Sequence, residues 1–170
     1  RGGVLWFGTY GGGGNKYDRL RDNFSYFRHI PDNPNSLSGN FVFPIHVDSE
    51  GYAWIGTFGT GLNRLTWSTG QVIRYQHSET KPNSITSNIL YSIYEDQDGM
   101  LWIGTANGLD RFDRRTSRFV HYQRDPEDPA SLSANTVFEV FVDSSNNLWV
   151  GTVAGLDLLD RETGTFKHYA

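Results

Sequence analysis

Large apolar residues recur along this chain in one short pattern that appears four times. Each copy reads apolar residue, Trp, second apolar residue, Gly, Thr, and the copies lie at Leu5–Thr9, Ala53–Thr57, Leu101–Thr105 and Leu148–Thr152. The Trp residues of successive copies are 48, 48 and 47 positions apart. A sequence that repeats with a period of this size is typical of solenoids and propellers, in which every repeat folds into the same unit.

Each repeat contains four short runs of β-forming residues separated by turn residues. In the third copy we expect strands at 89–96, 100–105, 109–113 and 118–123. Glycine and polar residues lie between these runs, as in hairpin turns. No repeat contains the ten or more residues with a 3.6-residue period that a helix needs. Four strands per repeat is the number in a propeller blade, so the repeat predicts a propeller and argues against a helical solenoid.

The first strand of each repeat is apolar on both of its faces. In the second copy its apolar residues are Phe41, Val42, Phe43, Ile45 and Val47. Such a strand must be covered on both sides. Blades that pack face to face around an axis provide this cover, whereas a two-sheet sandwich would leave one face of each strand in water. The predicted fold class is therefore all-β, a β-propeller.

The repeats account for about 3.75 blades of four strands, because the first copy lacks its first strand. We treat residues 1–170 as a single partial β-propeller with blade 1 at 1–30, blade 2 at 38–77, blade 3 at 86–124 and blade 4 at 133–170. Propellers typically have four to eight blades, and an open arc leaves an apolar face at each end. We therefore expect a segment of a larger ring, or half of a ring, with further propeller blades in cis or from another chain as partners.

Charge and composition narrow the classes of partner. The chain has 15 Lys and Arg against 19 Asp and Glu, a net charge of −4, and these charges are scattered. We therefore expect no nucleic-acid partner. No apolar stretch approaches the eighteen or so residues of a membrane span, so we expect no span in this segment. The absence of cysteine excludes disulfides and thiolate metal sites but does not decide the compartment.

The residues around each Trp resemble the two-component regulator propeller repeat. Residues 96–113 carry the pattern Asp-x-x-Gly-x-Leu-Trp-Ile-Gly-Thr-x-x-Gly-Leu-x-Arg-x-Asp almost without gaps. Segments 31–40 and 125–135 carry the Pro-x-x-Pro-x-Ser-Leu-Ser-x-Asn signature of the connections between blades, and 81–88 carries a shortened variant. The resemblance covers essentially the whole chain. Residues 11–17 and Thr66-Trp67 depart from the pattern, which weakens single turns.

The resemblance implies the extracytoplasmic sensor region of a hybrid two-component histidine kinase or a diguanylate cyclase. Several members of the family respond to oligosaccharides. We accordingly expect a periplasmic or otherwise extracytoplasmic domain of a membrane-anchored protein, with a homodimer in the full protein. Because no kinase, cyclase or receiver segment is present, we expect this segment to be no enzyme and to have no catalytic residues and no cofactor.

The repeated Trp residues are expected to pack between blades rather than to bind a ligand. Aromatic rings stack well on sugar rings, but a residue that every repeat requires is most simply a packing element. These inter-blade residues are Trp6, Trp54, Trp102 and Trp149.

A ligand site is expected at the loops around the channel mouth, where the repeats differ most. The direction of the strands places the loops after the second strands and the starts of the first strands at the same face. The candidate ligand-binding residues are Tyr10, Phe58 and Asn107 in those loops, Asn40, Asn88 and Asn135 before the first strands, and His46 on the first strand of blade 2. Tyr10 and Phe58 are the best stacking candidates, whereas the repeated Asn can equally cap a turn.

Two further patterns suggest metal binding but are interpreted as structural. Residues 96–99, Asp-Gln-Asp-Gly, begin like a calcium loop but lack the later acidic ligand. Four histidines are interpreted as one outer-strand position of successive blades, where the blades splay apart and cannot bring side chains to one ion. These are His29, His77, His121 and His168. We therefore expect no metal site.

Three functions remain open at this point. The first is a ligand-sensing segment of a bacterial signal-transduction sensor, with an oligosaccharide or another small ligand as partner. The second is a scaffold propeller that binds another protein. The third is a propeller lyase, which would require a histidine and an acidic residue meeting at the channel mouth.

Overall fold

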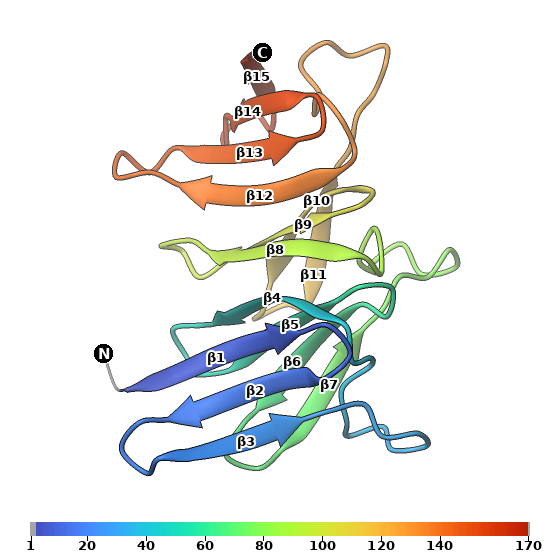
Figure 1. The fold of residues 1–170 in the computed structure, drawn as a ribbon. Coiled ribbons are helices and arrows are strands. Elements are labelled where there is room, and N and C mark those ends of the chain that lie inside the picture. Colours follow the sequence, from blue (N-terminus) through green and yellow to red (C-terminus); the bar gives the residue numbers. More distant parts are fainter. Residues whose placement is uncertain (1–2, 170) are drawn as a thin grey trace.

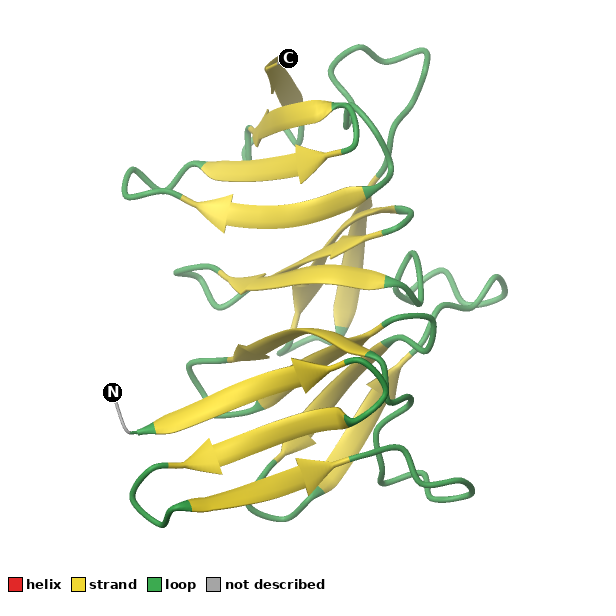
Figure 2. Cartoon of the chain, viewed as in Figure 1, coloured by secondary structure: helices red, strands yellow, loops and turns green. Residues whose placement is uncertain are grey.

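The computed structural model describes residues 3–169, and these residues form fifteen β-strands and no helix (Figures 1 and 2). Because this part of the chain has no helix, it has none that could cross a membrane. The strands belong to four antiparallel sheets, which we number as blades 1 to 4 in chain order. Blade 1 consists of β1 (Val4–Thr9), β2 (Gly13–Asp18) and β3 (Asn23–Phe27); blade 2 of β4 (Val42–Val47), β5 (Ala53–Thr57), β6 (Leu62–Thr66) and β7 (Gln71–Tyr75); blade 3 of β8 (Leu90–Glu95), β9 (Leu101–Thr105), β10 (Gly108–Asp113) and β11 (Arg118–Tyr122); and blade 4 of β12 (Val137–Val142), β13 (Leu148–Thr152), β14 (Gly155–Leu159) and β15 (Phe166–Tyr169).

Each blade is a meander in which consecutive strands pair with one another. The first strands β4, β8 and β12 lie next to each other, and in blade 1, which lacks this strand, β1 lies beside β4. Figure 1 shows the four sheets in a row, with blades 1 and 4 at opposite ends. The predicted β-propeller is therefore confirmed, in the form of an open arc of blades.

Neighbouring blades bury apolar side chains between their faces. Trp54 and Leu62 of blade 2 form one fully buried cluster with Leu101, Ile103 and Phe112 of blade 3. A second cluster joins blade 3 to blade 4 in the same way. Burying one large apolar side chain contributes about 1.5–3 kcal/mol, so these stacked faces are the main source of stability.

The two end blades lack this cover on one side. Phe7 and Phe24 of blade 1 are 46% and 52% exposed, and Phe141 of blade 4 is 57% exposed. The apolar surface expected at each end of an open arc is therefore present.

The glycine of the repeated pentapeptide lies where the first strand of the next blade approaches. A Cβ atom on Gly104 would be 2.9 Å from both Cγ1 and the carbonyl oxygen of Val137, the first residue of β12, and 2.5 Å from Ser92 Oγ. The same approach joins Gly8 to Val42 and Gly56 to Leu90. Only a residue without a side chain allows one blade to pack this closely on the next.

A hydrogen-bonded network ties the connection between blades to the outer strands. In blade 3 the fully buried Asp110 accepts the Thr86 N–H at 2.9 Å with one carboxylate oxygen and lies 2.7 Å from His121 Nδ1 with the other. Blade 4 repeats the arrangement with Asp157, Ser133 and His168. In both blades the hydrogen bond to the carboxylate raises the pKa of the histidine above its ordinary value, although burial opposes this shift.

The expectation that four histidines share one outer-strand position is wrong. His121 and His168 lie within β11 and β15, each opposite an aspartate of the neighbouring strand. His29 and His77 instead follow the ends of β3 and β7, and their Nδ1 atoms are 2.8 Å from backbone carbonyl oxygens of the connections between blades. The loop after the second strand is longer in blades 1 and 2, which shifts the later residues of those repeats relative to the Trp.

Gly104→Ala should destabilise the protein, because the added Cβ would collide with the first strand of blade 4. Overpacking of this kind costs about 1–3 kcal/mol, and we expect a loss of about 2 kcal/mol in the free energy of unfolding measured in urea. Gly151→Ala is the matched control, since its Cβ would come no closer than 3.7 Å to another atom. Neither glycine has a positive φ. Equal losses in the two variants would contradict the close-approach explanation.

Stability should depend on pH through His121 and His168. Their pKa values are raised in the folded protein, so their contribution is fully present below the ordinary value of 6.5 and is lost as the pH rises through the raised values. The double variant Asp110→Asn, Asp157→Asn should lose this dependence while keeping its fold. Asn63 already occupies the equivalent place in blade 2, where its Oδ1 accepts a backbone N–H of the connection at 2.8 Å. Urea unfolding from about pH 5 to about pH 9 measures the slope, and an unchanged slope in the double variant would rule out these pairs as its source.

Candidate functional site

Six aromatic side chains, five of them exposed and Tyr91 partly buried, form a row at the end of the blades where the first strands begin. We call this row the aromatic arc, and it consists of Tyr10, Phe41, Phe43, Phe58, Tyr91 and Phe138. The ring centroids are 5.9 Å apart between Phe43 and Phe58, 6.5 Å between Phe58 and Tyr91, and 5.2 Å between Tyr91 and Phe138. Tyr10 and Phe41 form a further pair at 4.6 Å. The arc is therefore continuous across blades 2 to 4, and the pair of Tyr10 and Phe41 extends it from blade 2 to blade 1.

A β-bulge in each complete blade places one of these rings outside the packed core. The pairing register shifts in β4 between Val42 and Ile45, in β8 between Leu90 and Ser92, and in β12 between Val137 and Glu139. A bulge leaves an extra residue unpaired and turns its side chain in a new direction. In all three blades a bulge residue is aromatic, namely Phe43, Tyr91 and Phe138, and the two Phe rings are 53% and 49% exposed.

The arc contains two residues that the sequence singled out as ligand-binding candidates and four that it did not, one of which is Phe41, just before β4. Tyr10 and Phe58 lie in the arc, where they are 83% and 46% exposed. Phe43, Tyr91 and Phe138 belong to the first strands, whose apolar residues were all assigned to packing. The missed signal was an aromatic residue at the same place in three successive repeats, two positions into the first strand.

A continuous row of exposed rings is a surface suited to binding. Single exposed apolar residues are common on protein surfaces, but large contiguous apolar patches are rare and mark interaction sites. Ring faces can stack on another flat ring or on the C–H face of a sugar, and the hydroxyl groups of Tyr10 and Tyr91 add polar ends to the surface.

The three asparagines before the first strands hold the connections between blades. Their Oδ1 atoms accept the backbone N–H of the residue eleven positions earlier, from His29 to Asn40 at 2.8 Å, from His77 to Asn88 at 2.8 Å and from Arg124 to Asn135 at 2.7 Å. Each asparagine thus links the end of the last strand of one blade to the start of the first strand of the next blade. Asn107 is exposed in its loop, and its Nδ2 lies 3.5 Å from the Thr86 carbonyl oxygen.

His46 lies at the far end of its strand from the arc. It lies five positions after Phe41, roughly 15 Å along an extended strand. Its Nε2 is 3.6 Å from Glu95 Oε2 on β8 and has no hydrogen-bond partner. The Glu95 carboxylate accepts hydrogen bonds from Ser49 and Arg114. The lyase hypothesis requires a histidine and an acidic residue at the channel mouth. His46 and Glu95 instead lie close together at the opposite end of the strands.

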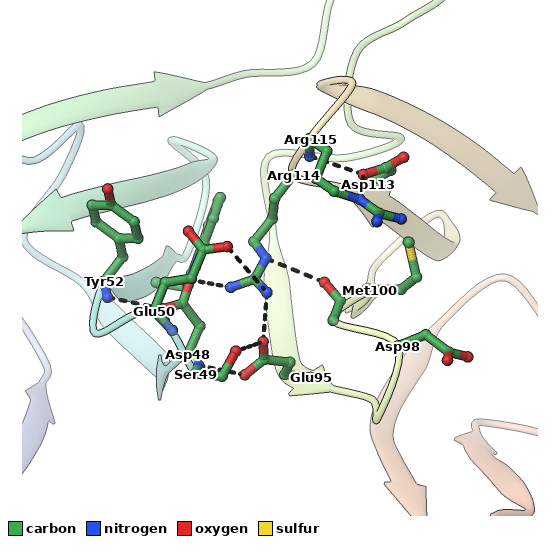
Figure 3. A network of polar contacts seen from close by, with 12 residues as sticks. Asp48, Ser49, Glu50, Tyr52, Glu95, Asp98, Met100, Asp113, Arg114 and Arg115 are labelled. Atoms are coloured by element: carbon green, nitrogen blue, oxygen red, sulfur yellow. Dashed lines mark hydrogen bonds and ion pairs between the residues drawn. The ribbon is translucent and has the colours of Figure 1, made fainter.

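An ionic network joins blades 2 and 3 at this far end (Figure 3). Arg114 extends from the turn after β10, and its Nη1 is 2.5 Å from Asp48 Oδ2 of blade 2 while its Nη2 is 2.6 Å from Glu95 Oε1. Its Nε donates to the Gly99 carbonyl oxygen at 3.2 Å. Burial by itself lowers the pKa of Arg114, but the hydrogen bond to Asp48 and the charges of Glu95 and Asp48 outweigh burial and raise it. Arg114 therefore keeps its charge, and its contacts link blade 3 to blade 2.

Two of the repeated Trp residues are buried between blades, whereas Trp149 of blade 4 is partly exposed. Trp54 and Trp102 are 0% and 1% exposed and offer no surface to a ligand. Three of the indole nitrogens donate to the aspartate that ends the first strand of the same blade, Trp54 to Asp48 at 2.7 Å, Trp102 to Asp96 at 2.7 Å and Trp149 to Asp143 at 2.9 Å. Trp6 stacks on Phe27 with ring centroids 5.7 Å apart.

Three stretches of the chain match the family model for the two component regulator propeller, at residues 36–59, 84–107 and 131–154. Each stretch runs from the connection between blades, through the first strand and the Trp strand, into the following loop. No curated protein matches the sequence.

Solved propeller structures superimpose on almost the whole chain. The extracellular domain of BT3049 from B. thetaiotaomicron, described as a hybrid two component system, is 28% identical with a TM-score of 0.81, covering 98% of this chain and 22% of its own. The extracellular domain of BT4673 from the same organism, described as a one component system, is 27% identical with a TM-score of 0.71, covering 98% and 20%. The WD40 β-propeller domain of Doa1, at 13% identity and a TM-score of 0.64, covers 98% and 47% and shares the fold alone.

This chain spans about a fifth of the length of the first two structures. The repeated Trp pattern, the four sheets stacked as blades and the three family matches all describe the same unit. The chain therefore contains three repeats that match the two component regulator propeller, in blades 2, 3 and 4.

Proposed function

We propose that this chain is a ligand-binding segment of the extracytoplasmic sensor region of a bacterial signal-transduction protein, and that the aromatic arc is its recognition surface. The family matches and the two B. thetaiotaomicron extracellular domains support the sensor assignment. The segment itself is non-enzymatic, and catalytic output belongs to other domains of a membrane-anchored protein.

The observation that carries the proposal is the bulge in each complete blade. A bulge weakens pairing in the strand where it occurs, so its recurrence with an aromatic residue at the same place calls for a function at that place. Phe43 and Phe138 are about half exposed and are not needed to fill the interface between blades. The rings therefore remain available to a ligand.

An oligosaccharide fits this surface better than a single small molecule. The ring centroids follow one another at 5.2 to 6.5 Å across three blades. The C–H faces of several sugar rings of one oligosaccharide can therefore pack on several of these aromatic rings at once. Each stacked pair of rings contributes about 0.5–1.5 kcal/mol beyond its buried area. These contributions add when several units of one ligand stack on several rings.

A ligand that touches three blades also provides a route for a signal. It would stabilise the arrangement of blades that brings its contacts into register, and in a dimeric sensor it would shift the population between two dimer arrangements. A scaffold that binds another protein is the second candidate, because aromatic residues are also enriched in protein interfaces.

Removing the bulge aromatics should abolish ligand binding without unfolding the protein. We expect Tyr91→Ala to weaken binding of a responsive oligosaccharide about fivefold, and the triple variant Phe43→Ala, Tyr91→Ala, Phe138→Ala to weaken it more than about a hundredfold, at about 1 kcal/mol per ring. A thermal-shift screen with an oligosaccharide panel identifies the ligand, and titration calorimetry measures its affinity for each variant.

Tyr26→Ala is the matched control, since this tyrosine is 62% exposed on β3, outside the arc. Its affinity for the oligosaccharide should match that of the unmodified chain. If no member of a broad panel raises the unfolding midpoint, the scaffold candidate takes the place of the sensor. If a ligand binds the triple variant as tightly as the unmodified chain, the arc is not its site.

A further inference from the structure

Two arginines at the same repeat position join neighbouring blades where the first strands end. Arg114 of blade 3 and Arg161 of blade 4 each directly follow the aspartate that comes at the end of the third strand. Each reaches the turn aspartate, the residue that follows the first strand of the preceding blade. Arg114 meets Asp48 in the 2–3 joint, and Arg161 meets Asp96 in the 3–4 joint. The two joints can therefore be compared atom by atom.

In the 2–3 joint every nitrogen of the Arg114 guanidinium group has an acceptor. Nη1 lies 2.5 Å from Asp48 Oδ2, Nη2 donates to Glu95 Oε1 at 2.6 Å, and Nε donates to the Gly99 carbonyl oxygen at 3.2 Å. Glu95, the last residue of β8, also accepts the N–H and the hydroxyl group of Ser49, each at 2.7 Å. One carboxylate thus binds three donors that come from both blades.

The 3–4 joint lacks this carboxylate. Val142, the last residue of β12, stands at the repeat position of Glu95 and has no polar side-chain atom. Arg161 Nη1 lies 3.3 Å from Asp96 Oδ2. The Nε and Nη2 atoms of Arg161 are buried and have no hydrogen-bond partner within residues 3–169. The arginine is therefore only partly paired.

Gln97 of blade 3 supplies another donor to the 3–4 joint. It directly follows Asp96, as Ser49 directly follows Asp48. The Ser49 N–H donates to Glu95, whereas the Gln97 N–H has no acceptor in the part of the chain that the structure describes. Gln97 is exposed, and its side-chain amide can donate in place of the serine hydroxyl group. The donors that meet at one carboxylate in the 2–3 joint are thus all present in the 3–4 joint without it.

Blade 2 shows that the arginine and the carboxylate otherwise occur together. Its first strand also ends in a valine, Val47, and Trp67 stands where blades 3 and 4 have their arginines. Blade 3 has both members, Glu95 and Arg114, whereas blade 2 has neither. Blade 4 is the exception, because it keeps the arginine and has lost the carboxylate.

The unpaired nitrogens of Arg161 favour an anion as their acceptor. Buried donors are rarely left unpaired in proteins, and a guanidinium group binds a carboxylate through strong, charge-assisted hydrogen bonds. A carboxylate can accept from several donors at once and restores the charge that Glu95 carries in the 2–3 joint. The Arg161 side chain is 22% exposed, against 8% for Arg114, so an anion can reach it from the surface.

We propose that the 3–4 joint binds a small carboxylate, which takes the place that the side-chain carboxylate of Glu95 has in the 2–3 joint. Arg161 Nη2 and the Gln97 N–H hold its oxygens, while Arg161 Nη1 stays with Asp96. The bound anion joins blades 3 and 4 as Glu95 joins blades 2 and 3. This site lies at the opposite end of the blades from the aromatic arc and does not depend on a ligand there.

Acetate is the probe, and thermal unfolding measures its binding. The unfolding midpoint is followed during a titration with sodium acetate and, in parallel, with sodium chloride at the same ionic strength and neutral pH. We expect acetate at about ten times its dissociation constant to raise the midpoint by about 4 °C relative to chloride, because it binds the folded chain alone. Equal midpoints in the two salts throughout the titration would overturn the proposal.

Val142→Glu should abolish the difference between acetate and chloride, because the new side chain supplies the carboxylate from within the chain. Val47→Glu is the matched control. It makes the same change at the same repeat position of blade 2, where Trp67 replaces the arginine, so the response to acetate should remain complete. The proposal fails if Val142→Glu responds as the unmodified chain does, or if Val47→Glu loses the response as well.

Arg161→Lys tests the arginine separately and keeps the test decisive if Val142→Glu does not fold. Lysine retains the positive charge beside Asp96 but lacks the planar fork of donors. We expect the difference between the two salts to fall below about 1 °C, while a cooperative transition in chloride shows that the variant is folded. An undiminished response to acetate would mean that the anion binds elsewhere.

Discussion

The contact between the flat faces of neighbouring blades is the interaction on which the other features of this protein depend. A four-stranded sheet that is apolar on both faces cannot hide either of them alone, whereas a row of such sheets hides all but the outermost two. The contact combines burial around Trp54 and Trp102 with the close approach at the pentapeptide glycine. The indole N–H would be left unpaired in this interface, and the turn aspartate supplies its acceptor. Every part recurs with the period of the repeat.

The first strands of the stacked blades all begin at one end of the blades and finish at the other, and these two ends differ in chemistry. Where the first strands begin, bulges release one ring per blade from the core, and the rings form a surface that runs across blade boundaries. Where these strands end, arginine–carboxylate pairs join blade 2 to blade 3 and blade 3 to blade 4. Pairs of this kind contribute little net stability but restrict the geometry in which the charges stay paired. The aromatic arc thus lies on blades that are linked to one another at the opposite end.

The proposed sensing mechanism follows from the same arrangement. A ligand on the aromatic arc would contact several blades, so its binding energy depends on how those blades are placed relative to one another. Any displacement between blades then changes affinity, and by linkage binding favours one placement.

The sequence by itself determined the repeat, the four strands of each blade and the position of Trp between blades, because these depend on local periodicity and on which residues recur. It also pointed to the end of the blades where Tyr10 and Phe58 lie. Tertiary structure decided what depends on pairing register and on neighbours distant in the chain. An aromatic residue recurs at the places of Phe43 and Phe138, but only the pairing register shows that a bulge exposes these rings. Arg114 meets Asp48 only after one blade has packed on another. Histidines that look equivalent by order, such as His77 and His121, separate only when strand pairing shows which of them faces an aspartate.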